Sequence, residues 1–314
     1  MIDTKFYFLF TFFILILLSP LISQEGQLIH IVDMMDERQV PFATVSNPAK
    51  SQGIYANELG VFDLANKEIS ELDSLMISAI GYVDQLVLVK DLKGKDTISL
   101  DISDITLREV VVTASELDDE ESDGYYLGVL QKKNDGGLRR GESTPYGSEY
   151  AIRMEKKKLS DEIAQIYIYL NAFKGNAAPF RIKIYDDHEG LPSKLLHSMI
   201  VKPKRKLKKW KPIPLSNKIV TKNHKVFYVA FEWLETNEKK YTSTVKYRRD
   251  GKRYERTYFG QYLGSVQDPN QHIGFFIKGT LNDKWYNSNE ITNIKTGAPM
   301  RLAPIMLKVR MTNH

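Results

Sequence analysis

The densest group of chemically capable side chains is a basic stretch, KPKRKLKKWK, with a tryptophan near its end. Its cations surround Trp210, and they are Lys202, Lys204, Arg205, Lys206, Lys208, Lys209 and Lys211. Such density predicts binding to nucleic acid, lipopolysaccharide or an acidic polysaccharide through charge and counterion release. Two alternatives stay open: the stretch is a solvated loop, and Trp210 is a lid on a sandwich edge rather than a sugar platform.

A second basic element reads TVKYRRDGKRYERTY. The pair Asp250-Gly251 lies between alternating residues, a pattern typical of a hairpin whose two turn residues have positive φ. We expect the ribbon to carry a cationic, aromatic surface made of Lys246, Arg248, Arg253, Tyr247, Tyr254 and Tyr258. The alternative is that these charges only keep the hairpin soluble. From both elements we select six candidate ligand-binding residues: Lys204, Arg205, Lys208, Trp210, Arg248 and Arg253.

Signals for metal binding and catalysis are few. The six histidines lack the spacing of HExxH or a comparable ligand set. Asp186, Asp187 and Glu189 crowd one turn and offer oxygens to Ca²⁺, although three acids in a turn are more often solvated. Glu232 and Glu235 lie three apart on one strand and therefore point to opposite faces, unlike a glycosidase pair. We expect no catalytic residue, no metal and no cofactor, and hence a protein that is not an enzyme.

The first 23 residues have the pattern of a signal peptide. An apolar run from Phe6 to Leu18 follows Lys5, Pro20 then breaks the helix, and cleavage after Ser23 is favoured. The alternative is a retained membrane anchor, but the run is short for a membrane span. We expect export, with the protein periplasmic, associated with the outer membrane or at the cell surface. Export makes nucleic acid an improbable partner.

Composition indicates two domains of opposite charge. The 314 residues suffice for two cores, and the absence of cysteine means that neither disulfides nor a lipidated cysteine contribute. Residues 24 to 123 hold 21 acids and 7 bases, a net charge of 7 − 21 = −14, whereas residues 124 to 314 hold 17 acids and 36 bases, 36 − 17 = +19. This asymmetry predicts two docked domains, or a basic half that meets an anionic partner.

The first domain is predicted as a small β-sandwich over residues 24 to 114. Short strands separated by turn residues are expected at Leu28 to Val32, Ala43 to Val45, Gly60 to Leu64, Ser74 to Ala79, Gln85 to Val89 and Thr97 to Leu100. Alternation in GVFDL and LMISAI, without a helical stripe, favours antiparallel sheets. The fold class that we predict is all-β, with two sandwich domains.

Several residues of this first domain resemble the carboxypeptidase regulatory-like domains, transthyretin-like sandwiches found in many exported proteins of Bacteroidetes-type bacteria. The matching residues are Asp33, Val40 to Val45, Asn57, Gly60, Val61, Phe62, Leu64 and Ile80-Gly81-Tyr82. Ala56 and Leu59 depart from the family's usual turn residues. The resemblance covers about a quarter of the chain and implies an accessory sandwich without zinc-binding residues or peptidase activity.

The segment LREVVVTA, residues 107 to 114, resembles the connection between such a domain and the plug of TonB-dependent transporters. The remaining chain is too short for the strands of a transporter barrel, so we predict a last edge strand of the first sandwich. The acidic run SELDDEESDG follows, and residues 115 to 142 are predicted as a solvated linker.

Residues 143 to 314 are predicted as a second, larger sandwich that resembles a jelly roll or a galactose-binding-like domain. Its expected strands are Ile163 to Leu170, Phe180 to Ile184, Met199 to Val201, Lys225 to Trp233, Gly274 to Lys278 and Met306 to Met311. In KVFYVAFEW one face is expected in the core and the other, with Glu232, at least partly in water.

Three functions stay open. The first is a binding or scaffold protein whose basic second sandwich meets an anionic glycan, a lipid headgroup or a protein. The second is a carbohydrate-binding module or carbohydrate-active enzyme, which predicts a face with Trp and Tyr side chains. The third is a structural component of a surface or adhesion complex, which predicts an exposed apolar patch or edge strand.

Overall fold

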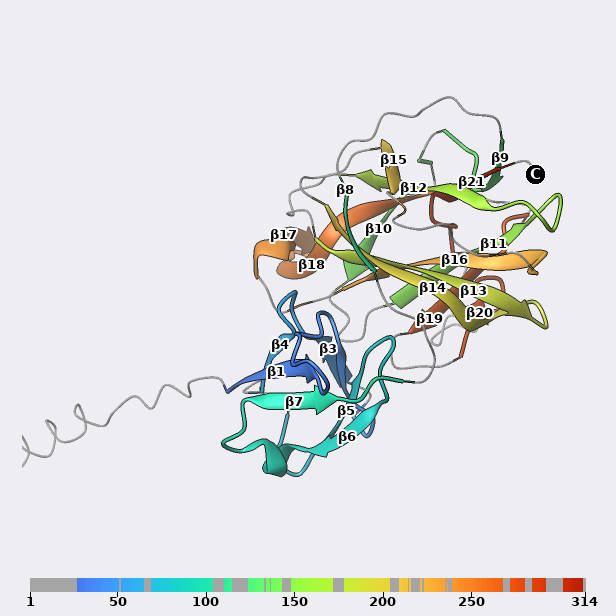
Figure 1. Cartoon of the computed structure of the whole chain (residues 1–314). Coiled ribbons are helices and arrows are strands. Elements are labelled where there is room, and N and C mark those ends of the chain that lie inside the picture. Colours follow the sequence, from blue (N-terminus) through green and yellow to red (C-terminus); the bar gives the residue numbers. More distant parts are fainter. Residues whose placement is uncertain are drawn as a thin grey trace, which may run out of the picture.

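We describe the protein from a computed structural model of the whole chain (Figure 1). It describes residues 27 to 312, with gaps at 51, 65–68, 104–109, 115–123, 133, 136, 143–147, 172–177, 204–208, 214, 216–220, 222, 235, 237–238, 268–271, 280–283 and 292–301. The predicted signal peptide lies outside the described residues. Among the residues that are described, no helix has the length and apolar character needed to cross a membrane.

The chain is all-β and forms two sandwiches, as predicted (Figure 1). In the first sandwich, a three-stranded sheet has the order β4-β1-β7 and a four-stranded sheet has the order β3-β2-β5-β6. The strands are β1 (Leu28–Asp33), β2 (Thr44–Asn47), β3 (Gln52–Tyr55), β4 (Val61–Asp63), β5 (Ser74–Ser78), β6 (Gln85–Leu88) and β7 (Thr97–Leu100). A short 3-10 turn (Val89–Leu92) follows β6.

The core of the first sandwich lies where the two sheets face each other. Ile29 and Ile31 of β1 and Ile98 of β7 pack with Val45 of β2 and Ile77 of β5. Along β1 and β5, Ile29, Ile31 and Ile77 alternate with more exposed residues, because successive side chains of a strand point to opposite faces. The buried face of each of these two strands therefore forms its part of the core.

The turn before β4 depends on Asn57 and Gly60. The Asn57 side-chain oxygen accepts hydrogen bonds from the backbone N–H groups of Leu59 and Val61, at 2.8 and 3.0 Å. Gly60 has φ of +69°, and a Cβ there would lie 2.8 Å from the Ile31 carbonyl oxygen. Only glycine fits this conformation without strain.

Asp33 and Tyr82, the first and last residues on which the family resemblance rests, are in contact. The hydroxyl of Tyr82 donates a hydrogen bond of 3.0 Å to Asp33, whose other oxygen accepts one from the Met35 backbone at 2.8 Å. The Met35 N–H lowers the pKa of Asp33, with a further contribution from Tyr82. Burial and the bond to Asp33 raise the pKa of Tyr82 to about 12. These hydrogen bonds join the end of β1 to the segment between β5 and β6.

The second sandwich consists of two seven-stranded sheets. One has the order β10-β18-β12-β21-β9, with β15 beside β12 and β17 beside β18, and the other has the order β20-β19-β11-β16-β13-β14-β8. The strands are β8 (Val110–Ala114), β9 (Tyr125–Gly128), β10 (Gly137–Glu142), β11 (Ser148–Glu155), β12 (Ile163–Asn171), β13 (Phe180–His188), β14 (Leu191–Pro203), β15 (Lys209–Ile213), β16 (Val226–Trp233), β17 (Thr242–Arg249), β18 (Lys252–Ser265), β19 (Phe275–Gly279), β20 (Tyr286–Asn287) and β21 (Leu307–Met311). A 3-10 turn (Lys239–Tyr241) precedes β17.

The core of the second sandwich is large and aromatic. Side chains of β12, β18 and β21 pack against those of β11, β13 and β16. Phe180, Phe231 and Trp233 make tilted and edge-on ring contacts, with centroids 4.7 to 5.9 Å apart. Edge-on packing of this kind is favoured by the quadrupoles of the rings.

The hairpin predicted at Asp250-Gly251 is present. The two residues have φ of +51° and +73°, and they join β17 to β18 with Arg249 opposite Lys252. Glu189 and Gly190 form a second such turn, with φ of +54° and +81°, between β13 and β14.

The edge strand predicted at the end of the first sandwich belongs to the second instead. β8 pairs in parallel with β14, so that Val110 lies opposite Met199 and Ala114 opposite Pro203. Its sequence, VVVTA, suits a strand in either sandwich, and only the register with β14 decided the outcome.

The predicted linker is also shorter than expected. β9 and β10 both lie within residues 115 to 142, where β9 pairs with β21 and β10 with β18. The second sandwich therefore takes strands from before Ser143, its predicted first residue. The prediction missed them because the acidic run lowered the hydrophobicity of the whole segment.

The prediction for β16 was half right. Phe227, Val229, Phe231 and Trp233 lie in the core, but the opposite face with Tyr228, Ala230 and Glu232 is buried too. Tyr228 and Ala230 belong to a second apolar cluster with Ala151, Tyr185, Phe276 and Trp285. Glu232 is only 1% exposed, so its charge is compensated within the protein.

Candidate functional site

A row of charged side chains crosses the outer face of the sheet that contains β19, β11, β16 and β13. The strand register places Lys278 of β19 opposite Glu149 of β11, Glu149 opposite Glu232 of β16, and Glu232 opposite Arg181 of β13. Directly opposite residues on one face of a sheet have neighbouring side chains. The pleat alone therefore gathers two carboxylates and two cations into one line.

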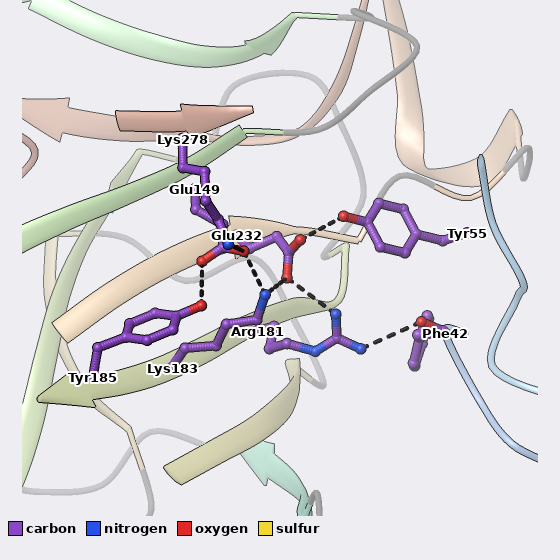
Figure 2. A network of polar contacts seen from close by, with 8 residues as sticks. All are labelled: Phe42, Tyr55, Glu149, Arg181, Lys183, Tyr185, Glu232 and Lys278. Carbon is purple, nitrogen blue, oxygen red and sulfur yellow. Dashed lines mark hydrogen bonds and ion pairs between the residues drawn. The ribbon is translucent and has the colours of Figure 1, made fainter. Parts of the chain in front are cut away.

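Lys183 joins the two carboxylates of this row (Figure 2). Its Nζ lies 2.6 Å from Glu149 Oε1 and 3.0 Å from Glu232 Oε2. Arg181 Nη1 donates to Glu232 Oε2 at 3.0 Å, and Lys278 Nζ lies 3.3 Å from Glu149 Oε1. Each carboxylate thus lies between two cations.

Tyr185 completes the second-sandwich part of this group. Its hydroxyl donates a 2.7 Å hydrogen bond to Glu149 Oε2. Burial and the negative charge of Glu149 raise the pKa of Tyr185 well above its ordinary value, so the phenol stays neutral. Trp285 packs edge-on against its ring, with centroids 5.5 Å apart.

The first sandwich reaches into the same group. The Tyr55 hydroxyl donates to Glu232 Oε1 at 2.5 Å, and Arg181 Nη2 donates to the Phe42 carbonyl oxygen at 3.3 Å (Figure 2). Phe42 and Tyr55 also form an apolar cluster with Ile200 and Leu234 of the second sandwich. We call Glu149, Arg181, Lys183, Tyr185, Glu232 and Lys278, with Tyr55 and Phe42, the interface network.

The loop around Phe42 is held in an uncommon conformation at this contact. Phe42 has φ of +55°, which is rare for a bulky residue, and its side chain is completely buried. Lys202 lies over its ring, with Nζ 5.5 Å from the centroid. Strain of this kind persists only where surrounding contacts over-determine the backbone, as the bond from Arg181 does here.

Exposed ion pairs border the interface. Glu58 of the first sandwich lies 3.5 Å from Lys202 Nζ and 3.3 Å from Lys240 Nζ. One acidic side chain thereby meets two cations across the junction, in agreement with the opposite net charges of the two halves. Partly exposed pairs of this type add little stability, so the buried group dominates.

Glu232 and Lys183 of the interface network are held in their charged forms near neutral pH. Burial alone would raise the pKa of Glu232, but Lys183, Arg181 and the bond from Tyr55 lower it to about 2. Burial would lower the pKa of Lys183, whereas Glu149 and Glu232 raise it above its ordinary value. A carboxylate and an amine held so firmly in their charged forms are suited to joining two domains and not to exchanging protons.

The candidate residues Arg248 and Arg253 lie opposite each other in the ribbon formed by β17 and β18. We call the paired residues from Thr244 to Thr257 the ribbon. Both arginines are exposed, and Lys246 is paired with Glu255 at 2.8 Å. Strand pairing with β10 begins only at Tyr258, so the pairs described for the ribbon itself are between its own two strands.

The single cationic and aromatic surface predicted for the ribbon is divided between two faces. Lys246, Arg248 and Arg253 lie on one face, because they alternate with Tyr247 and Tyr254 on the other. The two tyrosines stack on each other, with centroids 5.6 Å apart and an interplanar angle of 20°. Tyr258 is buried at the base of the ribbon.

Trp210 lies on β15, away from the ribbon, and is partly buried. Its ring packs edge-on against Tyr169 at 5.9 Å. Lys308 Nζ lies 4.5 Å from the ring of Tyr126, 5.1 Å from that of Tyr167 and 4.8 Å from that of Trp210. Trp210 therefore belongs to an aromatic cluster around a lysine, built from four strands.

The other candidates and the acidic turn complete the comparison with the sequence. Lys204, Arg205 and Lys208 lie outside the described residues. Asp186 accepts a hydrogen bond from the Lys194 backbone and Asp187 from the Tyr228 hydroxyl, both at 2.6 Å. Over the described residues, no three His, Asp or Glu side chains are placed to hold a metal ion.

The interface network was not predicted from the sequence. In FRIKIYD, Arg181, Lys183 and Tyr185 alternate with apolar residues, which ordinarily predicts a wet face. The signal that could have predicted the network is that Glu149 and Glu232 lie on neighbouring strands, in register with Arg181. That signal becomes readable only once the strand pairing is known.

We compared the chain with protein-family models, with curated proteins and with solved structures, and none of the three comparisons found a significant match.

Proposed function

We propose that this is an exported, non-enzymatic binding or scaffold protein whose second sandwich presents the ribbon to an anionic partner. The observation that carries this proposal is the charge of the ribbon. Between Val245 and Arg256 it holds six cations, Lys246, Arg248, Arg249, Lys252, Arg253 and Arg256, against two acids, Asp250 and Glu255. A projecting surface with a net charge of 6 − 2 = +4 attracts polyanions.

The interface network supports the scaffold part of this proposal. Buried hydrogen bonds from Tyr55 and Arg181 tie the two sandwiches together, and Glu58 adds exposed ion pairs at the junction. These contacts place an acidic domain against a basic one, and Arg248 and Arg253 of the ribbon stay exposed. The cellular location that we propose is the periplasm, the outer membrane or the cell surface.

We also propose that the first sandwich is a carboxypeptidase regulatory-like domain in the role of an accessory module. Its support is the Asn57 and Gly60 turn and the hydrogen bond between Asp33 and Tyr82. These contacts give a physical role to residues on which the resemblance rests.

The test is binding of the mature chain, Gln24 to His314, to immobilised lipopolysaccharide, acidic polysaccharides and neutral polysaccharides at low and high salt. We expect affinity for the anionic ligands to fall steeply with salt, because exposed charges are screened beyond a Debye length of about 8 Å at 0.15 M. Arg248→Glu should abolish this binding, whereas Arg38→Glu on the first sandwich is the matched control. Binding that survives high salt would contradict the proposal.

A second candidate function, carbohydrate binding, is favoured by the cluster of Tyr126, Tyr167, Trp210 and Lys308. Tyr126 is 40% exposed, and aromatic rings on a sheet face are suited to stacking against sugars. This function predicts binding to a neutral polysaccharide that is insensitive to salt and lost in Trp210→Ala. Retention of binding in that variant would exclude this cluster as the carbohydrate-binding site.

A further inference from the structure

The strand register of the ribbon creates an unfavourable pair of like charges. Arg248 and Arg253 lie directly opposite each other, and Arg249 and Lys252 form the pair next to the turn. In a hairpin with a two-residue turn, the closing pair is hydrogen-bonded and the next pair is not. Side chains approach most closely in a non-hydrogen-bonded pair, where the Cα atoms are about 4.5 Å apart.

The charge on this face is not compensated. Lys246 is neutralised by Glu255, and Thr244 and Thr257 hydrogen-bond each other at 3.1 Å. Within the part of the chain that the structure describes, neither Arg248 nor Arg253 has an ion-pair partner. Like charges directly opposite each other destabilise a sheet, so the face carries two positive charges that an anion would relieve.

The charge and geometry select one class of anion. A phosphate monoester carries a charge of about −1.5 to −2 at pH 7, which matches two guanidinium groups, and its oxygens accept paired hydrogen bonds from arginine. A sulfate ester, a phosphodiester or a carboxylate carries a single negative charge and leaves one arginine uncompensated. The stacked rings of Tyr247 and Tyr254 on the other face stabilise the ribbon that holds both arginines.

We propose that Arg248 and Arg253 form a clamp for the phosphate monoester of a phosphorylated saccharide. This inference rests on the proposed function, because it names the ligand of the same ribbon. Charged groups on this face are Lys246, Glu255 and the two arginines, with Asp250 at the turn. None is a histidine, the side chain whose charge normally changes between pH 5 and 8, so the ligand itself supplies any pH dependence in that range.

The experiment compares glucose 6-phosphate with glucose 6-sulfate, two probes that differ only in the ester. Each is titrated into the mature chain by NMR at pH 7.5 and at pH 5.5. The second pKa of a phosphate ester is about 6, so we expect tighter binding of the phosphate at pH 7.5 and a loss of that advantage at pH 5.5. Binding of the sulfate should be weaker and the same at both pH values.

Variants assign the effect to the clamp. Arg248→Gln and Arg253→Gln should each weaken glucose 6-phosphate binding about tenfold, because each removes a charge-assisted hydrogen-bond donor. Each should leave the melting temperature unchanged or raised, since a like-charge pair is removed. Lys252→Gln, on the opposite face of the same ribbon, is the matched control and should keep the affinity.

The outcomes separate the two proposals. Equal affinities for phosphate and sulfate, or no change between the two pH values, would overturn the clamp while salt-sensitive binding of polyanions still stood. Full affinity in Arg248→Gln and Arg253→Gln would also overturn it. If no anionic polysaccharide or lipopolysaccharide bound at low salt, the proposed function would itself fail.

Discussion

The interface network and the ribbon use the same residue types to opposite effect. In the network, Arg181 and Lys183 are buried, and each lies within 3.0 Å of a carboxylate. In the ribbon, Arg248 and Arg253 are exposed and face each other. A buried charge must be paired within the protein, whereas water tolerates a repulsive pair at the surface. Burial therefore decides which arginines hold the two domains together and which stay exposed.

The largest expected effect is that of Glu232→Gln. Loss of this carboxylate leaves Arg181 and Lys183 with reduced compensation in a buried site, which typically costs about 3 to 5 kcal/mol. Urea denaturation measures this as a lower free energy of unfolding. The matched control is Glu255→Gln in the ribbon, where we expect no measurable change. Similar losses in the two variants would remove the distinction between the regions.

The second-largest effect is expected from acid, which should remove the stabilising contribution of Glu232. The pKa of Glu232 is lowered from 4.5 to about 2, so its stabilising contribution is complete above about pH 4.5 and is lost as the pH falls through 2. The free energy of unfolding of the wild type should therefore fall more steeply over this range than that of Glu232→Gln. Parallel pH profiles for the two proteins would contradict the assignment.

A smaller effect is expected from Tyr55→Phe, which removes only the bond from the first sandwich to Glu232. Hydrogen bonds to charged groups contribute about 1.5 to 3 kcal/mol, so the free energy of unfolding should fall by about that amount. Tyr254→Phe, on the exposed face of the ribbon, is the control. A neutral result for Tyr55→Phe would mean that this hydrogen bond adds no measurable stability to the junction.

The smallest effect is expected from Glu58→Gln at the border of the junction. Its two ion pairs with Lys202 and Lys240 are partly exposed, so we expect a loss of about 0.5 kcal/mol or less that disappears in high salt. Thermal unfolding at two salt concentrations measures it. A loss as large as that of Tyr55→Phe would show that this border contributes as much as the buried bond.

Local patterns in the sequence were sufficient for much of the fold. The predicted strands overlap β1, β5, β7, β12 and β16, and alternation marked β5 and β16 because successive side chains of a strand point to opposite faces. Asp250-Gly251 located the hairpin of the ribbon, since positive φ at two successive residues is a property of these residues themselves. Candidates on the ribbon could be chosen for the same reason.

Pairing between distant strands could not be read in this way. β8 carries a sequence suitable for either sandwich, and its parallel register with β14 placed it in the second. Lys246, Arg248 and Arg253 lie on the face of the ribbon opposite Tyr247 and Tyr254, and this division follows from local alternation along the two strands.

The sequence by itself determined the all-β class, most strands and the ribbon, because these depend on neighbours along the chain. Only the tertiary structure decided that the polar face of β16 is buried. Glu232 meets Arg181, Lys183, Glu149 and Tyr55, which come from three other strands separated from it by 49 to 177 residues. A charge is stable in the interior only when such partners converge, and the convergence is a property of the fold.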